Sequence, residues 1–200
     1  MLLHALIPAS RANGPGLRAV VFFQGCNLGC RGCWNKSSHP FAGTEVAVDA
    51  VVHEVVRVHA DFDLEGVTFS GGEPMQQADT LLGLMQSLRR QTPELRFGMF
   101  SGYTERELDC GLYWTWKELS LPERQWSWKE VRGLLDFAVL GRFNQNQPSM
   151  LPLRTSRNQV LRLFTNRYTD ADFNEQLVEV SIHEGGRAEL TGFPVRGMPW

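Results

Sequence analysis

The chain has 200 residues, a length that suits one domain and falls short of the roughly 250 residues of a full eight-unit (β/α) barrel. Lysine and arginine number 20 and aspartate and glutamate 22, so the net charge of −2 favours neither nucleic acid nor an anionic membrane as a partner. A hydrophobic fraction of 42% and a charged fraction of 21% are typical of a soluble globular protein and exclude a disordered one. Because no apolar run reaches the ~18 residues of a membrane span and the apolar opening lacks a basic start, we expect one cytoplasmic domain over 1–200.

The predicted elements alternate between strands and helices. Runs of β-branched and aromatic residues predict strands at 17–24, 66–70, 96–101 and 137–140. A cap at Thr44 followed by valines at helical spacing predicts a first helix, and apolar repeats over 81–88 and the segment 128–135 predict two more. Such alternation predicts a mostly parallel sheet, in which ligands bind at the carboxyl ends of the strands.

Two segments depart from this alternation. Four of the six tryptophans lie between 114 and 128, so 109–127 is interpreted as a Trp-rich insertion that packs on or caps the site. Residues 142–156 are interpreted as a polar loop. A Gly-Gly pair between two apolar runs predicts a terminal hairpin over 176–191, for which core packing is the favoured role.

Three of the four cysteines, Cys26, Cys30 and Cys33, lie within eight residues in the spacing C-x3-C-x2-C. Iron–sulfur clusters are held by cysteine thiolates, and three thiolates on a [4Fe–4S] cube leave one iron open to a further ligand. A structural zinc site that adds His39 is an alternative, although we interpret His39 as structural. An electron-transfer ferredoxin would need Cys110 as a fourth ligand; we interpret Cys110 as a buried apolar filler.

The turn Gly71-Gly72-Glu73-Pro74 follows the strand predicted at 66–70. A glycine pair at a strand end lets the backbone approach a ligand closely, and a carboxylate beside it can bind an ammonium group. The same four residues also fit an ordinary surface turn. Their place at a strand end next to the cysteine loop favours the ligand-binding interpretation.

Together these motifs resemble the radical S-adenosylmethionine (SAM) superfamily. Within it they are most similar to the small activating enzymes of glycyl-radical enzymes, of the type that activates anaerobic ribonucleotide reductase. The similarity runs in order from residue 13 to about residue 163. The matching stretches are Asn13-Gly14-Pro15-Gly16-Leu17-Arg18, the cysteine loop through Trp34-Asn35-Lys36-Ser37, Ser70-Gly71-Gly72-Glu73-Pro74, Ser101-Gly102-Tyr103-Thr104, Asp136 to Phe143 and Arg157-Asn158-Gln159.

The resemblance implies a partial (β/α) barrel of radical SAM type, with a mostly parallel sheet and a C-terminal hairpin. It implies a [4Fe–4S] cluster on Cys26, Cys30 and Cys33 and SAM as cofactors. A one-electron donor such as flavodoxin or ferredoxin would drive cleavage of SAM to a 5′-deoxyadenosyl radical, which takes a hydrogen atom from a glycyl-radical enzyme or another donor. The cofactor-binding residues by this analogy are Gly32, Cys33, Trp34 near the adenine, Gly71, Gly72 and Glu73 at the methionyl amino group, and Ser101 near the ribose or carboxylate.

Two other functions stay open at this point. One is a radical SAM enzyme acting on a small molecule or a peptide, with the segment 109–127 as an aromatic lid. The other is a non-catalytic, metal-stabilised module that binds a partner through exposed tryptophans. Arg18 and Lys36 are expected either to offset negative charge at the cluster and SAM or to be ordinary surface residues.

Overall fold

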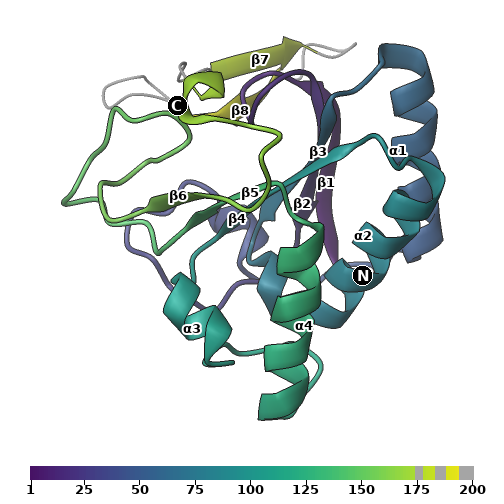
Figure 1. Cartoon of the computed structure of the whole chain (residues 1–200). Helices are drawn as coiled ribbons and strands as arrows, with labels where there is room; N and C mark the ends of the chain where they lie inside the picture. The colour runs from purple at the N-terminus through teal and green to yellow at the C-terminus, as the bar shows by residue number, and fades with distance from the viewer. Residues whose placement is uncertain (174–177, 183–187, 194–200) are drawn as a thin grey trace.

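The computed structural model describes residues 1–173, 178–182 and 188–193, and Figure 1 shows their arrangement. The larger sheet has its strands in chain order, from β1 to β6. Strands β2 to β5 run parallel, while β1 and β6 pair antiparallel at the two edges. The strands are β1 (Leu3–Ser10), β2 (Arg18–Phe23), β3 (Gly66–Gly71), β4 (Arg96–Ser101), β5 (Phe137–Leu140) and β6 (Val160–Leu163).

Helices connect the parallel strands, as the alternation predicts. Helix α1 (Val48–Phe62) lies between β2 and β3, and α2 (Ala78–Gln91) lies between β3 and β4. The longer connection from β4 to β5 contains α3 (Glu105–Asp109) and α4 (Leu121–Leu134). Three short 3-10 turns, Lys36–Ser38, Pro74–Gln77 and Asp170–Asp172, complete the helical elements of the described residues. None of these helices could span a lipid bilayer.

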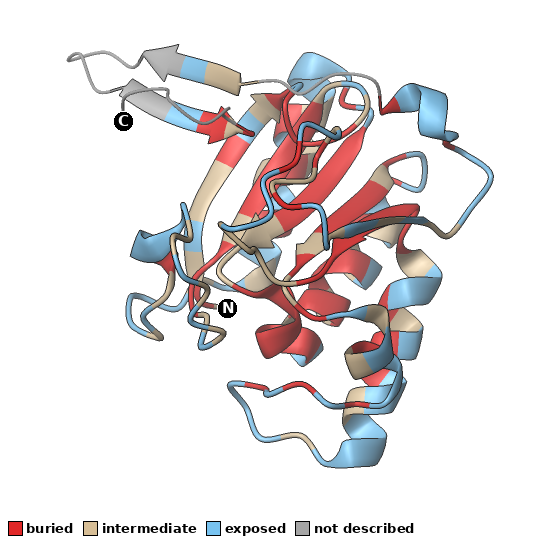
Figure 2. Ribbon diagram, turned by 90° about the vertical axis from the view of Figure 1, so that its left-hand side faces the viewer, coloured by how far each residue is buried: buried red, intermediate tan, exposed pale blue. Residues whose placement is uncertain are grey.

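One face of the sheet is covered by α1, α2 and α4. Val55 of α1, Leu84 of α2 and Val131 of α4 are fully buried in one cluster with Phe69 and Phe97 of the sheet. Figure 2 shows the buried residues concentrated in the strands and on the helix sides that face them. The helix periodicity read from the sequence therefore matches the face that packs on the sheet.

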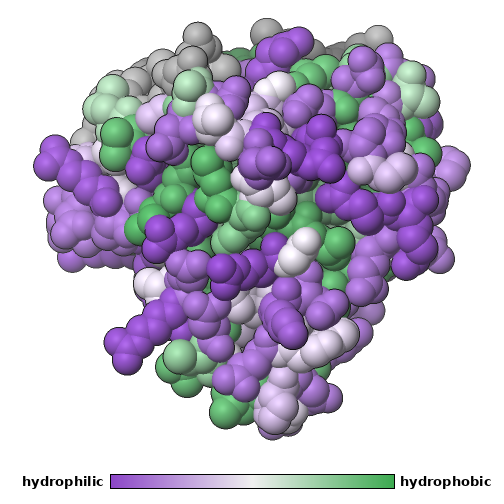
Figure 3. All heavy atoms as spheres, viewed as in Figure 1, coloured by the Kyte–Doolittle hydropathy of each residue, from purple (hydrophilic) through white to green (hydrophobic). Residues whose placement is uncertain are grey.

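The opposite face of the sheet carries a second, smaller cluster. Phe137 and Val139 of β5 point to this side, because successive side chains of a strand alternate between faces. Figure 3, in the view of Figure 1, shows apolar residues in the middle of the molecule surrounded by hydrophilic ones. The buried members of the cluster are Phe137, Val139, Leu153, Tyr168, Phe173 and Phe193.

Several expectations need correction. The edge strands β1 and β6 and the short α3 were not predicted, because their apolar periodicity is weak and their pairing partners lie elsewhere in the chain. Helix α1 begins at Val48 with Ala47 as its N-cap, so Thr44 does not cap it. Within the described residues β1 and β6 do not pair with each other, so the sheet is open and a barrel is not shown.

The C-terminal hairpin is present as two antiparallel strands, β7 (Val178–Ile182) and β8 (Ala188–Gly192). Its predicted Gly-Gly turn, like residues 176 and 177 at its predicted start, lies outside the described residues.

Candidate cofactor site

The carboxyl ends of the four parallel strands border one pocket of about 440 Å³. This size falls in the range of small-molecule and cofactor sites. Gly32 lies in the cysteine loop but is not among the described residues that line the pocket. The predicted site residues that do line it are Cys26, Cys30, Cys33, Trp34, Gly71, Gly72, Glu73 and Ser101.

The cysteine loop begins where β2 ends. The backbone N–H of Cys26 donates to the carbonyl of His39 at 2.9 Å, so His39 contributes through its backbone. The Cys33 N–H donates to the Cys30 carbonyl at 3.2 Å and closes a turn between the second and third cysteines. Gly32 has a φ of +74°, a conformation that a residue with a Cβ rarely adopts. The loop therefore presents its thiols from a defined backbone conformation.

The three thiols are free and partly buried. Burial, followed by the negative charge of Glu73, raises the pKa of Cys26 to about 12, and burial also raises the pKa of Cys33. Both thiols therefore stay protonated at neutral pH until positive charge arrives. A metal centre that binds here must release protons as it takes the thiolates.

The arrangement fits a cube better than a single ion. Across the described residues, no three His, Cys, Asp or Glu side chains converge as the ligands of one metal ion, so the Cys3His zinc site is not formed. A [4Fe–4S] cube presents a separate iron to each thiolate, so its ligands need only surround one space. Cys26, Cys30 and Cys33 border the same pocket and meet that condition.

The two glycines of the Gly-Gly-Glu-Pro turn lie against the backbone at the end of β2 and just after it. A Cβ on Gly71 would lie 2.5 Å from the backbone nitrogen of Phe23, and one on Gly72 would lie 2.3 Å from the carbonyl oxygen of Gly25. The Gly72 N–H also donates to the Phe23 carbonyl at 2.7 Å. The close approach that requires glycine is therefore to the strand that leads into the cysteine loop.

Glu73 is 1% exposed, yet it lines the pocket. Its carboxylate accepts hydrogen bonds from Ser101 Oγ at 2.8 Å, from the Gly102 N–H at 2.7 Å and from the Met75 N–H at 3.0 Å. Burial raises the pKa of Glu73 to about 7, although these three donors oppose the rise. A carboxylate has about four acceptor positions, so this one can accept a further donor such as an ammonium group.

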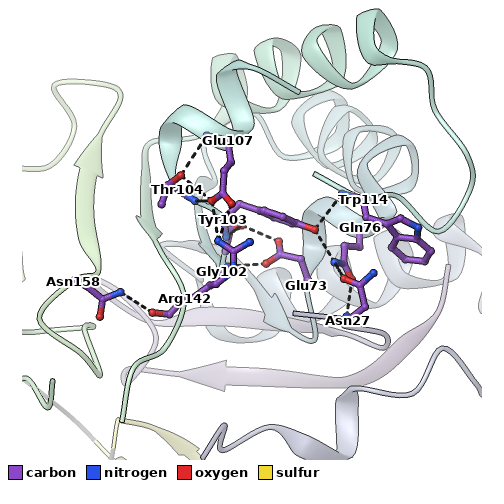
Figure 4. Close-up of polar contacts among 11 residues, drawn as sticks. Asn27, Glu73, Gln76, Gly102, Tyr103, Thr104, Glu107, Trp114, Arg142 and Asn158 are labelled. Atoms are coloured by element: carbon purple, nitrogen blue, oxygen red, sulfur yellow. Dashed lines mark hydrogen bonds and ion pairs between the residues drawn. The ribbon is translucent and has the colours of Figure 1, made fainter. Parts of the chain in front are cut away.

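A partly buried polar network beside the pocket was not predicted (Figure 4). Gln76 is fully buried and joins Asn27 of the cysteine loop to Tyr103, which follows β4. Arg142 donates to Glu107 of α3 at 2.8 Å and lies over the Tyr103 ring at 5.4 Å. The sequence holds little signal for these contacts, because glutamine and tyrosine after a strand are common and their partners are distant.

The hairpin also contributes to the pocket, which was not expected. Residues Leu190 to Phe193 line it, together with His4 and Ile7 of β1. The Asn13 side chain donates to Thr191 Oγ1 at 2.9 Å and attaches β8 to the loop after β1. Phe193 packs in the second apolar cluster, so the hairpin has a core-packing role and also forms a wall of the pocket.

Other interpretations were wrong. Cys110 is exposed rather than buried, because only Leu108 of the short α3 faces the core. Arg18 is fully buried at the start of β2, so it is not a surface residue. It is also not among the described residues that line the pocket. No residue of the segment 109–127 is among the described residues that line the pocket, so the segment does not form the expected lid.

Comparisons with known proteins agree with this geometry. Residues 12–162 match the family described as a 4Fe-4S single cluster domain. The anaerobic ribonucleoside-triphosphate reductase-activating protein of Escherichia coli K12 is 30% identical over 167 residues, which cover 80% of this chain and 97% of the relative. The protein of the same name from Haemophilus influenzae is 29% identical over 166 residues, covering 78% and 94%. The pyruvate formate-lyase-activating enzyme of Clostridium pasteurianum is 36% identical over 92 residues, covering 44% and 39%.

The family match extends from the loop before β2 into β6 and so includes the cysteine loop and the ends of all four parallel strands. The three thiols and the Gly-Gly-Glu turn that characterise the site lie within it. The chain therefore belongs to the 4Fe–4S single cluster domain family, among the radical SAM activating enzymes of glycyl-radical enzymes, with a [4Fe–4S] cluster and SAM as cofactors.

Proposed function

We propose that this chain installs a glycyl radical on a partner enzyme of the anaerobic ribonucleotide reductase type. The observation that carries the proposal is that the three cysteines and the Gly-Gly-Glu turn border one pocket in a chain whose relatives are named as activating proteins of that reductase. When bound, the cluster and SAM supply one-electron cleavage and a 5′-deoxyadenosyl radical that takes a hydrogen atom from the partner. The electron donor we propose is a flavodoxin or a ferredoxin.

The residues of the pocket have distinct roles in this proposal. Cys26, Cys30 and Cys33 hold the cluster. Glu73 accepts the methionyl ammonium group of SAM beside Gly71 and Gly72, which is supported by the acceptor position left on its buried carboxylate.

Trp34 and Ser101 act beside these groups. Trp34 is 43% exposed and packs against Phe143 with ring centroids 5.8 Å apart, so its ring offers an apolar surface for the adenine next to Gly32. Ser101 orients Glu73 by the hydrogen bond it donates. The apolar side chains of Phe100 and Phe193, whose rings lie 5.3 Å apart, keep water from the reacting groups.

We also infer that the open sheet serves as a partial (β/α) barrel of radical SAM type within a single domain. Support comes from both edges of the sheet. His4 and Ile7 of β1 border the pocket on one side, and Thr155 and Gln159, which precede β6, border it on the other.

The test uses anaerobically reconstituted, reduced protein with SAM and the candidate reductase. We expect 5′-deoxyadenosine and a glycyl-radical EPR signal on the partner. Cys30→Ala should abolish both, whereas Cys110→Ala should not, because that thiol is exposed and lies outside the described pocket lining. Absence of 5′-deoxyadenosine would refute the reaction. Its formation without a partner radical would refute the partner and favour a small-molecule or peptide substrate.

A further inference from the structure

The Trp-rich segment 109–127 contacts residues that in turn touch the neighbours of Cys26. Trp116 stacks on Phe41, with ring centroids 4.8 Å apart and an interplanar angle of 1°. Trp114 meets the same Phe41 ring edge-on at 4.9 Å. Phe41 lies in the segment that follows the cysteine loop, so the insertion contacts this segment. No residue of the insertion is among the described residues that line the pocket.

Two backbone hydrogen bonds fix the position of the insertion. The Trp116 N–H donates to the carbonyl of Gln76 at 2.6 Å. The Trp114 N–H donates to the hydroxyl of Tyr103 at 3.1 Å. Because Gln76 and Tyr103 follow β3 and β4, the insertion is attached to the same strand ends that border the pocket.

Gln76 connects these attachments to the cysteine loop (Figure 4). Its Oε1 accepts from the Asn27 N–H at 3.1 Å, and its Nε2 donates to Asn27 Oδ1 at 2.5 Å and to the Tyr103 hydroxyl at 2.8 Å. The Gln76 side chain is fully buried, and its hydrogen bond to Tyr103 is shielded from competing water. The two hydrogen bonds to Asn27 are partly buried, because Asn27 itself is exposed. Asn27 directly follows Cys26, and this contact fixes the backbone on that side of the ligand.

The other side of Cys26 is held by Gly25. A Cβ at Gly25 would lie 2.4 Å from the ring of Phe41, the ring on which Trp116 stacks. The Gly25 carbonyl also accepts from the Glu73 N–H at 2.9 Å. The residues before and after Cys26 are therefore both in contact with groups that the insertion touches, Gly25 with Phe41 and Asn27 with Gln76.

We propose that the Trp-rich insertion acts as a brace, meaning that its contacts hold the cysteine loop so that Cys26, the first cluster ligand, keeps its position. Gln76 is the positioning residue for Cys26, because it bonds to the neighbouring Asn27. Residues that orient a metal ligand without touching the metal typically change metal affinity 10- to 100-fold when they are replaced. The brace acts on the cluster through the position of Cys26, so its effect does not depend on which partner the enzyme activates.

The test compares Gln76→Met and Trp116→Ala with Trp126→Ala. Methionine matches glutamine in length but lacks its hydrogen-bonding groups. Trp126 is a tryptophan of the same insertion that is 55% exposed on α4, and it serves as the matched control. The measurements are the rate of iron loss from the reconstituted cluster to a chelator, the EPR spectrum of the reduced cluster with and without SAM, and the thermal midpoint of the cluster-free protein.

We expect Gln76→Met and Trp116→Ala to lose iron about tenfold faster than the parent chain and to alter the EPR spectrum, with Trp126→Ala within about twofold. Iron loss and spectra like those of Trp126→Ala would overturn the proposal. If Gln76→Met fails to fold, Tyr103→Phe, which removes one hydroxyl and keeps the ring, takes its place. An unchanged rate of iron loss in Tyr103→Phe and Trp116→Ala would equally refute the brace.

Discussion

Replacing Arg18 by methionine tests whether the Gly-Pro-Gly-x-Arg segment serves the fold or the cofactor. The Arg18 side chain is completely buried at the start of β2. Its guanidinium donates five hydrogen bonds, two to hydroxyl groups and three to backbone carbonyls. The acceptors are Thr68 Oγ1 at 2.8 Å, Tyr168 Oη at 3.1 Å, and the carbonyl oxygens of Pro15 at 3.0 Å, Val67 at 3.1 Å and Arg96 at 2.7 Å.

The magnitude follows from what methionine leaves behind. Among the described residues no carboxylate forms an ion pair with Arg18; Glu65 reaches it through the Tyr168 hydroxyl. Burial lowers the pKa of Arg18, while Tyr168 and Glu65 oppose that shift. Methionine removes the cost of burying a cation, but it leaves the buried acceptors of β3, of β4 and of the residues Pro15 and Tyr168 without their donor. We expect a loss of about 3–5 kcal/mol in the free energy of unfolding.

Urea unfolding of the cluster-free protein measures this loss. At an m-value of about 2 kcal/mol/M the midpoint should fall by about 1.5–2.5 M with m unchanged. Arg57→Met is the control, because Arg57 is exposed on α1 and, among the residues that the structure describes, pairs only with Glu54 and Asp61 at the surface, where ion pairs contribute little. A loss below about 1 kcal/mol in Arg18→Met, or a folded variant that no longer binds SAM, would refute a purely structural role.

Three further changes probe the site and its support. Glu73→Gln places an amide N–H₂ among three donors, including the Gly102 N–H, and should weaken SAM binding about 10- to 100-fold. An EPR titration of the cluster with SAM measures this, and a dissociation constant within twofold of that of the parent chain would contradict the role given to Glu73. Thr191→Val removes one of the two acceptors of the Asn13 side chain and should cost about 1–2 kcal/mol in urea unfolding. No loss would show that the hairpin is held by its other contacts, which include the hydrogen bonds that Glu179 of β7 accepts from Ser10 Oγ and the Arg11 N–H. Gly98→Ala would put a Cβ 2.2 Å from the Phe137 ring and should destabilise the chain by about 1–3 kcal/mol, and a neutral result would mean that this ring moves easily.

The parallel centre of the fold could be predicted because its signals are local. The valines of α1 lie at helical spacing in the sequence and are buried in that pattern in the structure, with Val51, Val52, Val55 and Val58 toward the core. The same holds for the apolar residues of α2. Since parallel strands end at one edge, the meeting of the cysteine loop with Gly71-Gly72-Glu73 follows from the element order.

The remaining features depend on contacts between distant residues. The sequence of β1 is apolar but shows no strand periodicity, and its antiparallel pairing with β2 is what identifies it as a strand. Arg18 resembles a surface cation until the carbonyls of Val67 and Arg96 are placed around it. The tryptophans of the insertion suggest a lid or a binding surface, and all three of them are exposed, as a binding surface requires. Only the position of Phe41 shows that Trp114 and Trp116 also pack beside the cysteine loop.

The glycine pair of the Gly-Gly-Glu-Pro turn shows how one sequence feature can serve fold and chemistry together. Gly72 lets β3 approach the Gly25 carbonyl so closely that a Cβ would lie 2.3 Å from it, and the next residue, Glu73, donates its own N–H to that carbonyl. Gly25 precedes Cys26, so the backbone next to the first thiol accepts a hydrogen bond directly from the backbone of Glu73, which carries the buried carboxylate. A displacement of either strand end would therefore move both groups together. The spacing between the cluster ligand and the carboxylate that we assign to the ammonium group of SAM is thus set by contact between backbones and does not depend on the rotamer of any side chain between them.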